Sequence, residues 1–436
     1  MVKKIEIAKI KLWNEFVGAV AWDERGFANF EYDLAFLKKG IQLSPITMPN
    51  RENFIYQFGN LNKETFKGLP GLLADSLPDA YGNKIIDAWL AQMGRSKEDF
   101  SPIERLCYMG KRGMGALEFE PVLDKDIQGI SHKIEIDKLV DLANEILNER
   151  KKLNAAFSKS QKINKKSLEE IISVGSSAGG ARPKAVIAYN EKSKEIRSGQ
   201  VEAPKGFDYW LLKFDGVSKK SLGLHDPLGF GKIEYVYYLM AEMSGIKISK
   251  SMLFNENNRS HFMTKRFDRK NGKKIHMQTL CGLAHYDYNQ AGAYSYEQAF
   301  QIIRKMSLSH EDTIQLFRRM IFNIVARNQD DHTKNISFLM EEDGKWRLSP
   351  AYDVTFSYDY SNQWLFTHQM MINGKRDNFT ISDIEKIAKD ENIKNWKAIF
   401  EEVLSGILLW EKFSKDLDIE KDKIIAIKKM HRLNLI

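Results

Sequence analysis

Two carboxylates, an imidazole, an ammonium and an amide lie within eight positions of a polar loop at residues 328–335. Within it, Asp330 and Asn335 have the spacing D-x-x-x-x-N, and Asp353 follows after a short apolar segment and a turn. Phosphoryl transfer from ATP needs an acidic residue that accepts the proton of the attacking hydroxyl, and an amide and a carboxylate on the bridging metal. The loop alone is as consistent with a solvated turn, because this spacing is common. Asp353, placed between apolar neighbours, favours phosphoryl transfer.

The apolar spacing on both sides of this loop predicts the elements that hold it. The apolar positions within residues 321–325 are typical of the end of a buried helix. Residues 336–340 predict a short strand, and Gly344 predicts a turn into a second strand that leads to Asp353. The sequence therefore predicts a helix, a polar loop and a hairpin in direct succession.

A lysine interrupts an apolar run earlier in the chain. Residues 209–215 read YWLLKFD and predict a strand whose Lys213 points into a cleft, since burial of an unpaired charge is costly. Kinases place a phosphate-pairing lysine on such a strand and hold it with a glutamate from the next helix. Residues 231–246 predict that helix, with Glu234 in its first turn. The two residues are also consistent with an ordinary ion pair.

Two glycines separate two strand-like runs within residues 171–188, which read IISVGSSAGGARPKAVIA. Small residues allow backbone N–H groups to approach a phosphate closely, and Lys184 adds positive charge. The segment is not a Walker A loop, because no G-K-[ST] follows the glycines. A tight Gly-Gly hairpin is the alternative interpretation.

Composition places the chain among ordinary globular proteins. It has 436 residues, 43% of them hydrophobic and 28% charged, and a formal net charge of +8 that favours an anionic partner. Two cysteines, Cys107 and Cys281, form neither a disulfide framework nor a zinc-binding spacing, so we expect a reducing cytoplasm. We see no signal peptide or membrane span in the sequence and expect no membrane partner.

The order of predicted elements divides the chain into four parts. Residues 4–21 predict a hairpin, and the segments that follow add a strand, two helices and a closing strand at 116–121. Residues 134–154 have helical apolar spacing, and the basic run at 150–166 is either a solvated connector or an anion-binding face. We expect an N-terminal subdomain at 1–124, a helical connector at 125–170, a lobe with the phosphate loop at 171–265 and a helical lobe with the catalytic loop at 266–436.

Taken together, these motifs resemble the HipA family, the serine/threonine-kinase toxins of bacterial toxin–antitoxin pairs. The similarity covers nearly the whole chain, and it weakens after about residue 365. The segments that carry it read GLPGLLADSLPDAYGNKIIDAWL, RGMGALEFEP, SSAGGARPKA, FMTKRFDR, GLAHYDY, NQDDHTKNISFL and LSPAYDV. The resemblance implies an α+β, bilobal, protein-kinase-like fold with an extra mixed α/β N-terminal subdomain and a mainly helical C-terminal lobe.

The resemblance also implies roles for individual residues. Asp330 would be the catalytic acid–base, Lys334 would stabilise the transferring phosphoryl group, and Asn335 and Asp353 would bind Mg²⁺. The residues implied in ATP binding are Ala178, Gly179, Gly180, Ala181, Arg182, Pro183, Lys184, Lys213, Lys265, Arg266, Phe267, His332 and Asp353.

Family members also autophosphorylate a serine of the phosphate loop, which switches the kinase off. Ser177 aligns best with that serine, and Ser176 is adjacent. A phosphate there would add negative charge beside a site for ATP phosphates. The loop departs from the family pattern at Arg182 and Pro183, which replace Gln-Glu with a guanidinium and a residue that lacks an N–H donor.

Three functions remain open. The first is a toxin kinase that phosphorylates a translation component such as an aminoacyl-tRNA synthetase, with a HipB-like helix-turn-helix antitoxin and operator DNA as partners. The second is a DNA-associated scaffold, and the intact set of Lys213, Asp330, Asn335 and Asp353 argues against it. The third is a small-molecule phosphotransferase, which the long N-terminal module argues against. We expect residues 365–436 to be helical, and their basic end either contacts DNA or forms a solvated face.

Overall fold

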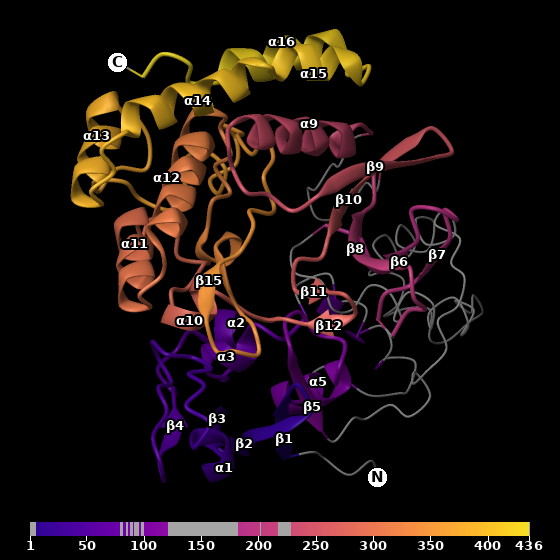
Figure 1. Cartoon of the computed structure of the whole chain (residues 1–436), viewed down its shortest axis with the longest axis vertical. Helices are drawn as coiled ribbons and strands as arrows, with labels where there is room; N and C mark the ends of the chain where they lie inside the picture. Colours follow the sequence, from indigo (N-terminus) through magenta and orange to yellow (C-terminus); the bar gives the residue numbers. More distant parts are fainter. Residues whose placement is uncertain are drawn as a thin grey trace.

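The computed structural model describes residues 6–78, 82–83, 86–87, 90, 96, 100–120, 182–200, 202–216 and 228–435. The described part of the chain includes four β-sheets, one of them two-stranded, and a layer of C-terminal helices (Figure 1). The predicted connector at 125–170 lies outside the described residues, as does most of the helix predicted before Gly94. Within the described residues, no helix combines the length and the apolar character needed to cross a bilayer.

The N-terminal module is built on a five-stranded antiparallel sheet in the order β4-β3-β2-β1-β5. Alternate residues of β1 are buried, as expected for a sheet with one face on a core. The predicted hairpin joins β1 to β2 through Trp13 and Asn14, which both have positive φ, as in the turn type that matches strand twist. The elements are β1 Ile7–Leu12, β2 Glu15–Asp23, β3 Phe27–Tyr32, α1 Leu34–Leu37, β4 Ile55–Gln57, α2 Lys63–Phe66, α3 Gly71–Ala74, α5 Pro102–Met109 and β5 Leu117–Glu120.

A second antiparallel sheet has the order β7-β6-β8-β10-β9, and one long helix, α9, packs against β10 and the edge strand β9. The register places Lys184 of β6 directly opposite Lys213 of β8. Helix α9 begins at Phe230, so Glu234 lies beyond the first turn in which we expected it. The elements are β6 Lys184–Tyr189, β7 Ile196–Ser198, β8 Asp208–Lys213, α9 Phe230–Met243, β9 Ser251–Glu256 and β10 Arg259–Lys265.

The catalytic-loop region follows the predicted order of helix, loop and hairpin. Helix α12 starts at a capping box of Ser309 and Asp312 and buries one apolar face, and a third sheet, β13-β14-β15, follows the loop. The elements are β11 Arg269–Lys270, β12 Lys273–Lys274, β13 His276–Thr279, α10 Leu280–Ala284, α11 Tyr296–Lys305, α12 His310–Val325, the 3₁₀ helix η2 Thr333–Asn335, β14 Ser337–Met340 and β15 Trp346–Leu348.

The C-terminal part is helical from Ile381 onwards, with α13 Ile381–Asp390, α14 Trp396–Leu408, α15 Trp410–Asp416 and α16 Lys421–Met430. The expectation of a helix from residue 365 is wrong for residues 365–380. This segment forms isolated bridges to other loops, and Asn373, Gly374 and Asn378 adopt positive φ, which interrupts a helix.

The N-terminal module packs closely against helix α10. A Cβ on Gly71 would lie 2.1 Å from the carbonyl oxygen of Gly282, and a Cβ on Gly282 would lie 2.2 Å from an Asp75 oxygen. The Asp75 carboxylate accepts hydrogen bonds from Thr279 N (2.6 Å) and Thr279 Oγ1 (2.8 Å). The module is therefore docked by backbone-to-backbone approach just before the catalytic loop.

Candidate functional site

Lys213 joins the second sheet to the helical lobe. Its ammonium lies 2.5 Å from Glu234 Oε1 on α9, and it also contacts Asp353 Oδ1 in the loop after β15. The side chains of Lys213 and Glu234 are 11% and 3% exposed, whereas that of Asp353 is 38% exposed. The most accessible member of this three-residue cluster is therefore the carboxylate that the sequence assigns to metal binding.

Charge compensation stabilises the ionised forms of Lys213 and Asp353. Burial opposes the charge on Lys213, but the Asp353 and Glu234 carboxylates outweigh it and hold its pKa above the ordinary value. Burial likewise opposes the charge on Asp353, but Lys213, Lys184 and His332 hold its pKa well below the usual range. Asp353 thus faces Lys213 and Lys184 from two strands and His332 from the catalytic loop.

Lys184 is the second lysine on this face of the sheet. It is 2% exposed and lies opposite Lys213 in the antiparallel register, so the two side chains share one face. Two like charges directly opposite each other repel, and the Asp353 carboxylate lies near both. The sheet therefore presents paired ammonium groups to the side of the cleft that carries Asp353.

Asp330 lies at the surface of the catalytic loop. Its side chain is 41% exposed, and its Oδ1 accepts a 2.7 Å hydrogen bond from the indole Nε1 of Trp364. The Asn335 amide nitrogen donates to the backbone carbonyl of Asp330 at 2.7 Å, which leaves the Asn335 amide oxygen as the atom that can ligate a cation. The loop thus holds an accessible carboxylate and a fixed amide side by side.

The adjacent carboxylate has a different environment. Asp331 is 3% exposed and accepts hydrogen bonds from Tyr296 OH (3.0 Å), His368 Nδ1 (2.9 Å) and Gln369 N (2.8 Å). A buried carboxylate with three donors anchors a loop and does not exchange protons with substrate. Asp331 therefore supports the loop from below, while Asp330 remains accessible above it.

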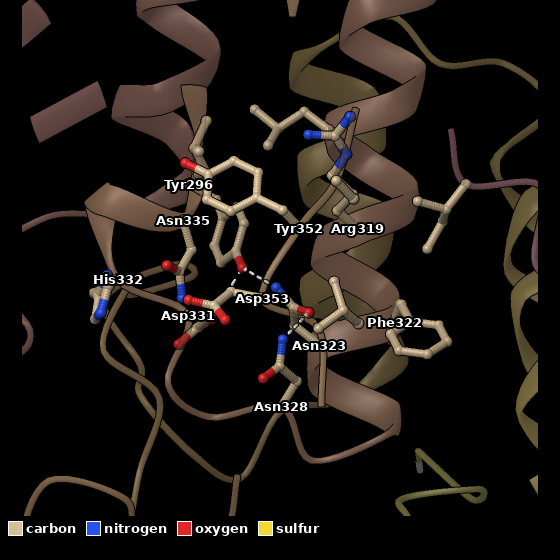
Figure 2. Close-up of a pocket in the computed structure, with 15 residues that line it drawn as sticks. Tyr296, Arg319, Phe322, Asn323, Asn328, Asp331, His332, Asn335, Tyr352 and Asp353 are labelled. Carbon is tan, nitrogen blue, oxygen red and sulfur yellow. Dashed lines mark hydrogen bonds between the residues drawn. The ribbon is translucent and has the colours of Figure 1, made fainter. Parts of the chain in front are cut away.

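A small cavity of about 20 Å³ lies beneath the loop. Asn335, Asp353, His332 and Asp331 are among the residues that line it, together with Tyr296, Arg319 and Asn323 from α11 and α12 (Figure 2). Carboxylate and amide oxygens are ligands that suit Mg²⁺, and Asn335 and Asp353 supply one of each at the same cavity. The donor set fits a magnesium ion.

His332 and Lys334 both lie beside the ring of Tyr288. His332 Nε2 is 3.8 Å from Asp330 Oδ1, and its ring lies beside Tyr288 and Trp364. The Lys334 ammonium lies 4.8 Å from the centre of the Tyr288 ring. Its positive charge opposes the rise that burial causes in the pKa of Asp75 in the N-terminal module. The structure thus turns Lys334 toward the N-terminal module.

The segment expected to receive adenine follows β10. Lys265 is tied through its backbone to Lys250 and Ser249, and its ammonium pairs with Asp208 at 2.7 Å. The Arg266 guanidinium is 2% exposed and forms two hydrogen bonds to Asp268, at 2.9 and 2.6 Å. A further hydrogen bond from Arg266 Nη2 to the Gly113 carbonyl (3.2 Å) ties this side chain to the N-terminal module, and the backbone N–H of Arg266 donates to the Tyr209 carbonyl at 2.8 Å.

Phe267 completes this segment, and its ring lies 5.4 Å from that of Tyr352. Tyr352 in turn donates to the Lys334 carbonyl and contacts Ser337 Oγ, so the segment is coupled to the catalytic loop. The contact of Phe267 with the residue before Asp353 ties together the two chain segments that border the cleft.

Part of the expected phosphate loop lies outside the described residues: Ser176, Ser177, Ala178, Gly179, Gly180 and Ala181. Its described end begins at Arg182, whose guanidinium lies 4.7 Å from the centre of the Phe230 ring at the start of α9. Pro183 accepts a backbone hydrogen bond from Phe214 N (3.1 Å), which fixes Lys184 at the start of β6.

Sequence reasoning missed three residues that shape the site. Trp364 anchors Asp330, His368 anchors Asp331, and Tyr288 faces both His332 and Lys334. Trp364 and His368 follow Asp330 by more than thirty residues in a segment without periodicity, so no spacing signal marks them. Tyr288 lies in the GLAHYDY motif, which was the available signal.

Two family models match this chain, one in its N-terminal part and one in its C-terminal part. Residues 8–120 match the family model of the HipA N-terminal domain, and residues 176–409 match that of the HipA-like C-terminal domain. Two bacterial relatives have names that propose kinase activity. Y4mE of Sinorhizobium fredii is 26% identical over 147 residues, and a Haemophilus influenzae protein is 29% identical over 162 residues. These matches cover 31% and 32% of this chain and only 34% and 46% of the relatives' own lengths.

A solved structure confirms the fold. HipA in a complex with HipB and operator DNA, from the toxin–antitoxin system of Shewanella oneidensis, aligns with a TM-score of 0.63. The alignment covers 97% of this chain and 95% of that one, at 16% sequence identity. The expected α+β, bilobal kinase-like architecture with an additional N-terminal subdomain and a mainly helical C-terminal lobe is confirmed. Because the C-terminal family model covers more than half of the chain, this protein belongs to the HipA family.

Proposed function

We propose that this protein is an ATP-dependent serine/threonine-protein kinase. The observation that carries the proposal is the convergence on Asp353, which contacts Lys213 of the sheet and lines the same cavity as Asn335 of the catalytic loop. A kinase site needs a lysine held by a glutamate on one side and an amide and a carboxylate on the other. Four groups of those types meet here from four separate elements: β8, α9, η2 and the loop after β15.

Each residue has a defined task in this scheme. Lys213, held by Glu234, would bind the α- and β-phosphates of ATP, and the neighbouring Lys184 would add positive charge. Asp330 would accept the proton of a serine or threonine hydroxyl, with Trp364 fixing its orientation. Asn335 and Asp353 would hold Mg²⁺, which supplies charge neutralisation at the transferring phosphate.

The remaining expected residues would enclose the nucleotide. The loop from Ala178 to Lys184 would lie along the phosphates, the backbone from Lys265 to Phe267 would receive adenine, and His332 would flank Asp330. Lys334 is directed toward Tyr288 in the structure, so a role at the phosphoryl group requires it to turn from that ring. Phosphorylation of Ser177, or of the adjacent Ser176, would place negative charge among these phosphate-binding groups and switch the kinase off.

We further propose that the kinase is the toxin of a toxin–antitoxin pair. The support is membership of the HipA family and the structural likeness to a HipA that is solved with HipB and operator DNA. The partners would be a HipB-like helix-turn-helix antitoxin and, through it, operator DNA. The substrate would be a component of translation such as an aminoacyl-tRNA synthetase.

Calorimetry with magnesium and ATP tests the nucleotide site. We expect binding by the wild type and at least about a tenfold weaker affinity for Lys213→Met, because a charge-assisted phosphate contact is lost. Lys192→Met, at an exposed turn between β6 and β7, is the matched control and should bind like the wild type. Equal affinity of the wild type and Lys213→Met would refute the assignment of Lys213.

Expression in cells tests the toxin and substrate assignments. Without an antitoxin, the wild type should slow growth, and Asp330→Gln should not. Co-expression of a HipB-like helix-turn-helix antitoxin should restore growth. Phosphoproteomics of the two strains should then reveal phosphoserine or phosphothreonine sites that are present only with the wild type. A harmless wild type without ATP binding would favour a DNA-associated scaffold, and label transfer to small molecules alone would favour a small-molecule phosphotransferase.

A further inference from the structure

A second cavity, of about 470 Å³, opens at the C-terminal end of α12, where Arg327 directly precedes the polar loop at residues 328–335. The end of α12, the loop before α13 and the chain after α16 surround it. It shares no lining residue with the cavity beside Asp353. Its lining consists of Arg327, Asp377, Asn378, Phe379, His431, Arg432, Leu433, Asn434 and Leu435.

The charges of this lining are unequal. The guanidinium of Arg432 contacts Asp377 Oδ1, and Nη1 of Arg327 lies 3.9 Å from the same oxygen, so two cations share one carboxylate. His431 is neutral at physiological pH, because burial and the charge of Arg327 lower its pKa to about 4. The lining therefore carries one uncompensated positive charge. Consistent with this, burial and the repulsion from Arg327 lower the pKa of Arg432 to about 10 despite Asp377.

The backbone holds both guanidinium groups in place. Arg327 has a φ of +57° directly after the end of α12, a position that glycine usually occupies. Its Nε donates to the Met430 carbonyl at 2.9 Å and its guanidinium lies over the Tyr358 ring. The backbone N–H of Arg432 donates to the Val325 carbonyl at 2.8 Å. The two cations are thus fixed from two chain segments that meet at the end of one helix.

The rest of the lining is mixed, because three apolar residues, Phe379, Leu433 and Leu435, stand among the polar Asn378, His431 and Asn434. Phe379 is buried, Leu433 and Leu435 are half-buried, and the Arg432 guanidinium lies 5.5 Å from the centre of the Phe379 ring. Two fixed guanidinium groups beside apolar side chains match a molecule with a charged head and an apolar body. We infer that this pocket binds a small organic oxyanion, a carboxylate or a phosphate monoester, with its anionic group at Arg327 and Arg432 and its apolar body against Phe379 and Leu433.

A chain of hydrogen bonds connects the pocket to the catalytic loop. Nη1 of Arg432 lies 3.2 Å from His368 Nε2, and His368 Nδ1 lies 2.9 Å from Asp331 Oδ2. Since a guanidinium only donates, His368 Nε2 must accept and its Nδ1–H must donate to Asp331. An oxyanion that draws Arg432 toward it therefore changes the support of Asp331, the residue next to Asp330. This coupling rests on the proposed kinase function, whereas binding itself does not.

Binding is tested by calorimetric titration of the full chain with phenyl phosphate and, separately, with benzoate. At least one probe should bind, and the stronger one identifies the anionic group that the pocket takes. Asn434→Asp adds a negative charge at an exposed position of the rim and should weaken binding by about fivefold or more, whereas Asn434→Lys should strengthen it. The assignment is overturned if neither probe binds. It is also overturned if neither Asn434→Asp nor Asn434→Lys changes the affinity for the probe.

Two further variants separate this pocket from the nucleotide site. Lys213→Met should leave binding of phenyl phosphate and benzoate unchanged, and Arg347→Gln, an exposed arginine on β15, serves as the matched control for loss of a guanidinium. Arg432→Gln should abolish binding. If Arg432→Gln unfolds, the two variants at residue 434 still test whether the probes bind in this pocket. Loss of binding in Lys213→Met with no effect at residue 434 would locate the probes in the other cleft and refute the inference.

The coupling has a readout that does not need kinase activity. Saturation with the bound probe should shift the imidazole ¹⁵N resonances of His368 in the wild type and leave those of the distant His261 in place. It should also change the rate of phosphoryl transfer, and Asn434→Asp should require more probe for the same change. Binding without a shift at His368 would refute the coupling. A shift at His368 in a protein without kinase activity would refute the proposed function and leave the pocket intact.

Discussion

The ammonium of Lys213 contacts the carboxylate of Asp353, which lies 140 residues further along the chain. This ion pair joins strand β8 of the second sheet to the loop after β15. Glu234 holds the same ammonium from α9, so Lys213 has two carboxylate partners. A nucleotide with its metal would compete with Lys213 for Asp353 and with Asp353 for Lys213. Under the proposed function, the contact would keep both groups charged and in position until nucleotide binds.

The pH dependence of stability should reveal this pair. The pKa of Asp353 is depressed, so its contribution is present above the unfolded value of about 4 and is lost as pH falls through the folded pKa. The pKa of Lys213 is raised, so its contribution is present below about 10.4 and is lost as pH rises through the folded pKa. The stability difference between wild type and Asp353→Asn should be largest near neutral pH and shrink at both extremes. Urea unfolding from pH 3 to pH 11 measures it, and a difference independent of pH would contradict the pairing.

Asp330→Gln should abolish phosphoryl transfer without unfolding the protein. Loss of a general base lowers the rate by about 10²–10⁴-fold, and an exposed loop side chain contributes little to stability. Radiolabel transfer from ATP gives the rate, and thermal unfolding gives the stability. Asp416→Asn, an exposed carboxylate at the end of α15, is the matched control. Undiminished label transfer in Asp330→Gln would remove Asp330 from the catalytic role.

Asp331→Asn should affect mainly the stability of the protein, whereas Asp330→Gln affects mainly phosphoryl transfer. The new amide places an N–H₂ group among the donors Tyr296, His368 and Gln369, so the free energy of unfolding should fall by about 2–4 kcal/mol. Denaturant unfolding measures this loss. Per folded molecule, label transfer should fall less in Asp331→Asn than in Asp330→Gln, because Asp331 acts on the reaction only through the position of the loop. Wild-type stability in Asp331→Asn would show that the buried hydrogen bonds do not anchor the loop.

Gly71→Ala should loosen the N-terminal module from α10. The added Cβ would lie 2.1 Å from the Gly282 carbonyl oxygen, and relief of such a backbone clash costs about 1–3 kcal/mol. Gly113→Ala is the matched control, because a Cβ there meets its nearest atom at an ordinary 3.9 Å. Hydrogen exchange should speed up at residues 279–285 in Gly71→Ala and not in Gly113→Ala. Unchanged exchange at those residues would show that the close approach does not hold the module in place.

Local sequence patterns were enough to predict the helix and strands around the catalytic loop. The helix that ends before residue 328, the hairpin of β14 and β15 and strand β8 follow from apolar periodicity and turn residues, because such signals act over a few neighbouring positions. The spacing of Asp330, Asn335 and Asp353 also follows from the sequence, since a short loop and a hairpin leave these residues little freedom to separate. Family likeness extended this to the fold of the whole chain, which the structural comparison confirms.

Burial and long-range partners had to come from the tertiary structure. The sequence presents Asp330 and Asp331 as two equal carboxylates, and only packing against Tyr296 and His368 buries the second and leaves the first exposed. Arg266 likewise looks like a cleft residue in the sequence, yet Asp268 and the Gly113 carbonyl bind its side chain at the N-terminal module. Side-chain direction depends on which distant segment packs on each face, and no spacing within one segment encodes that choice.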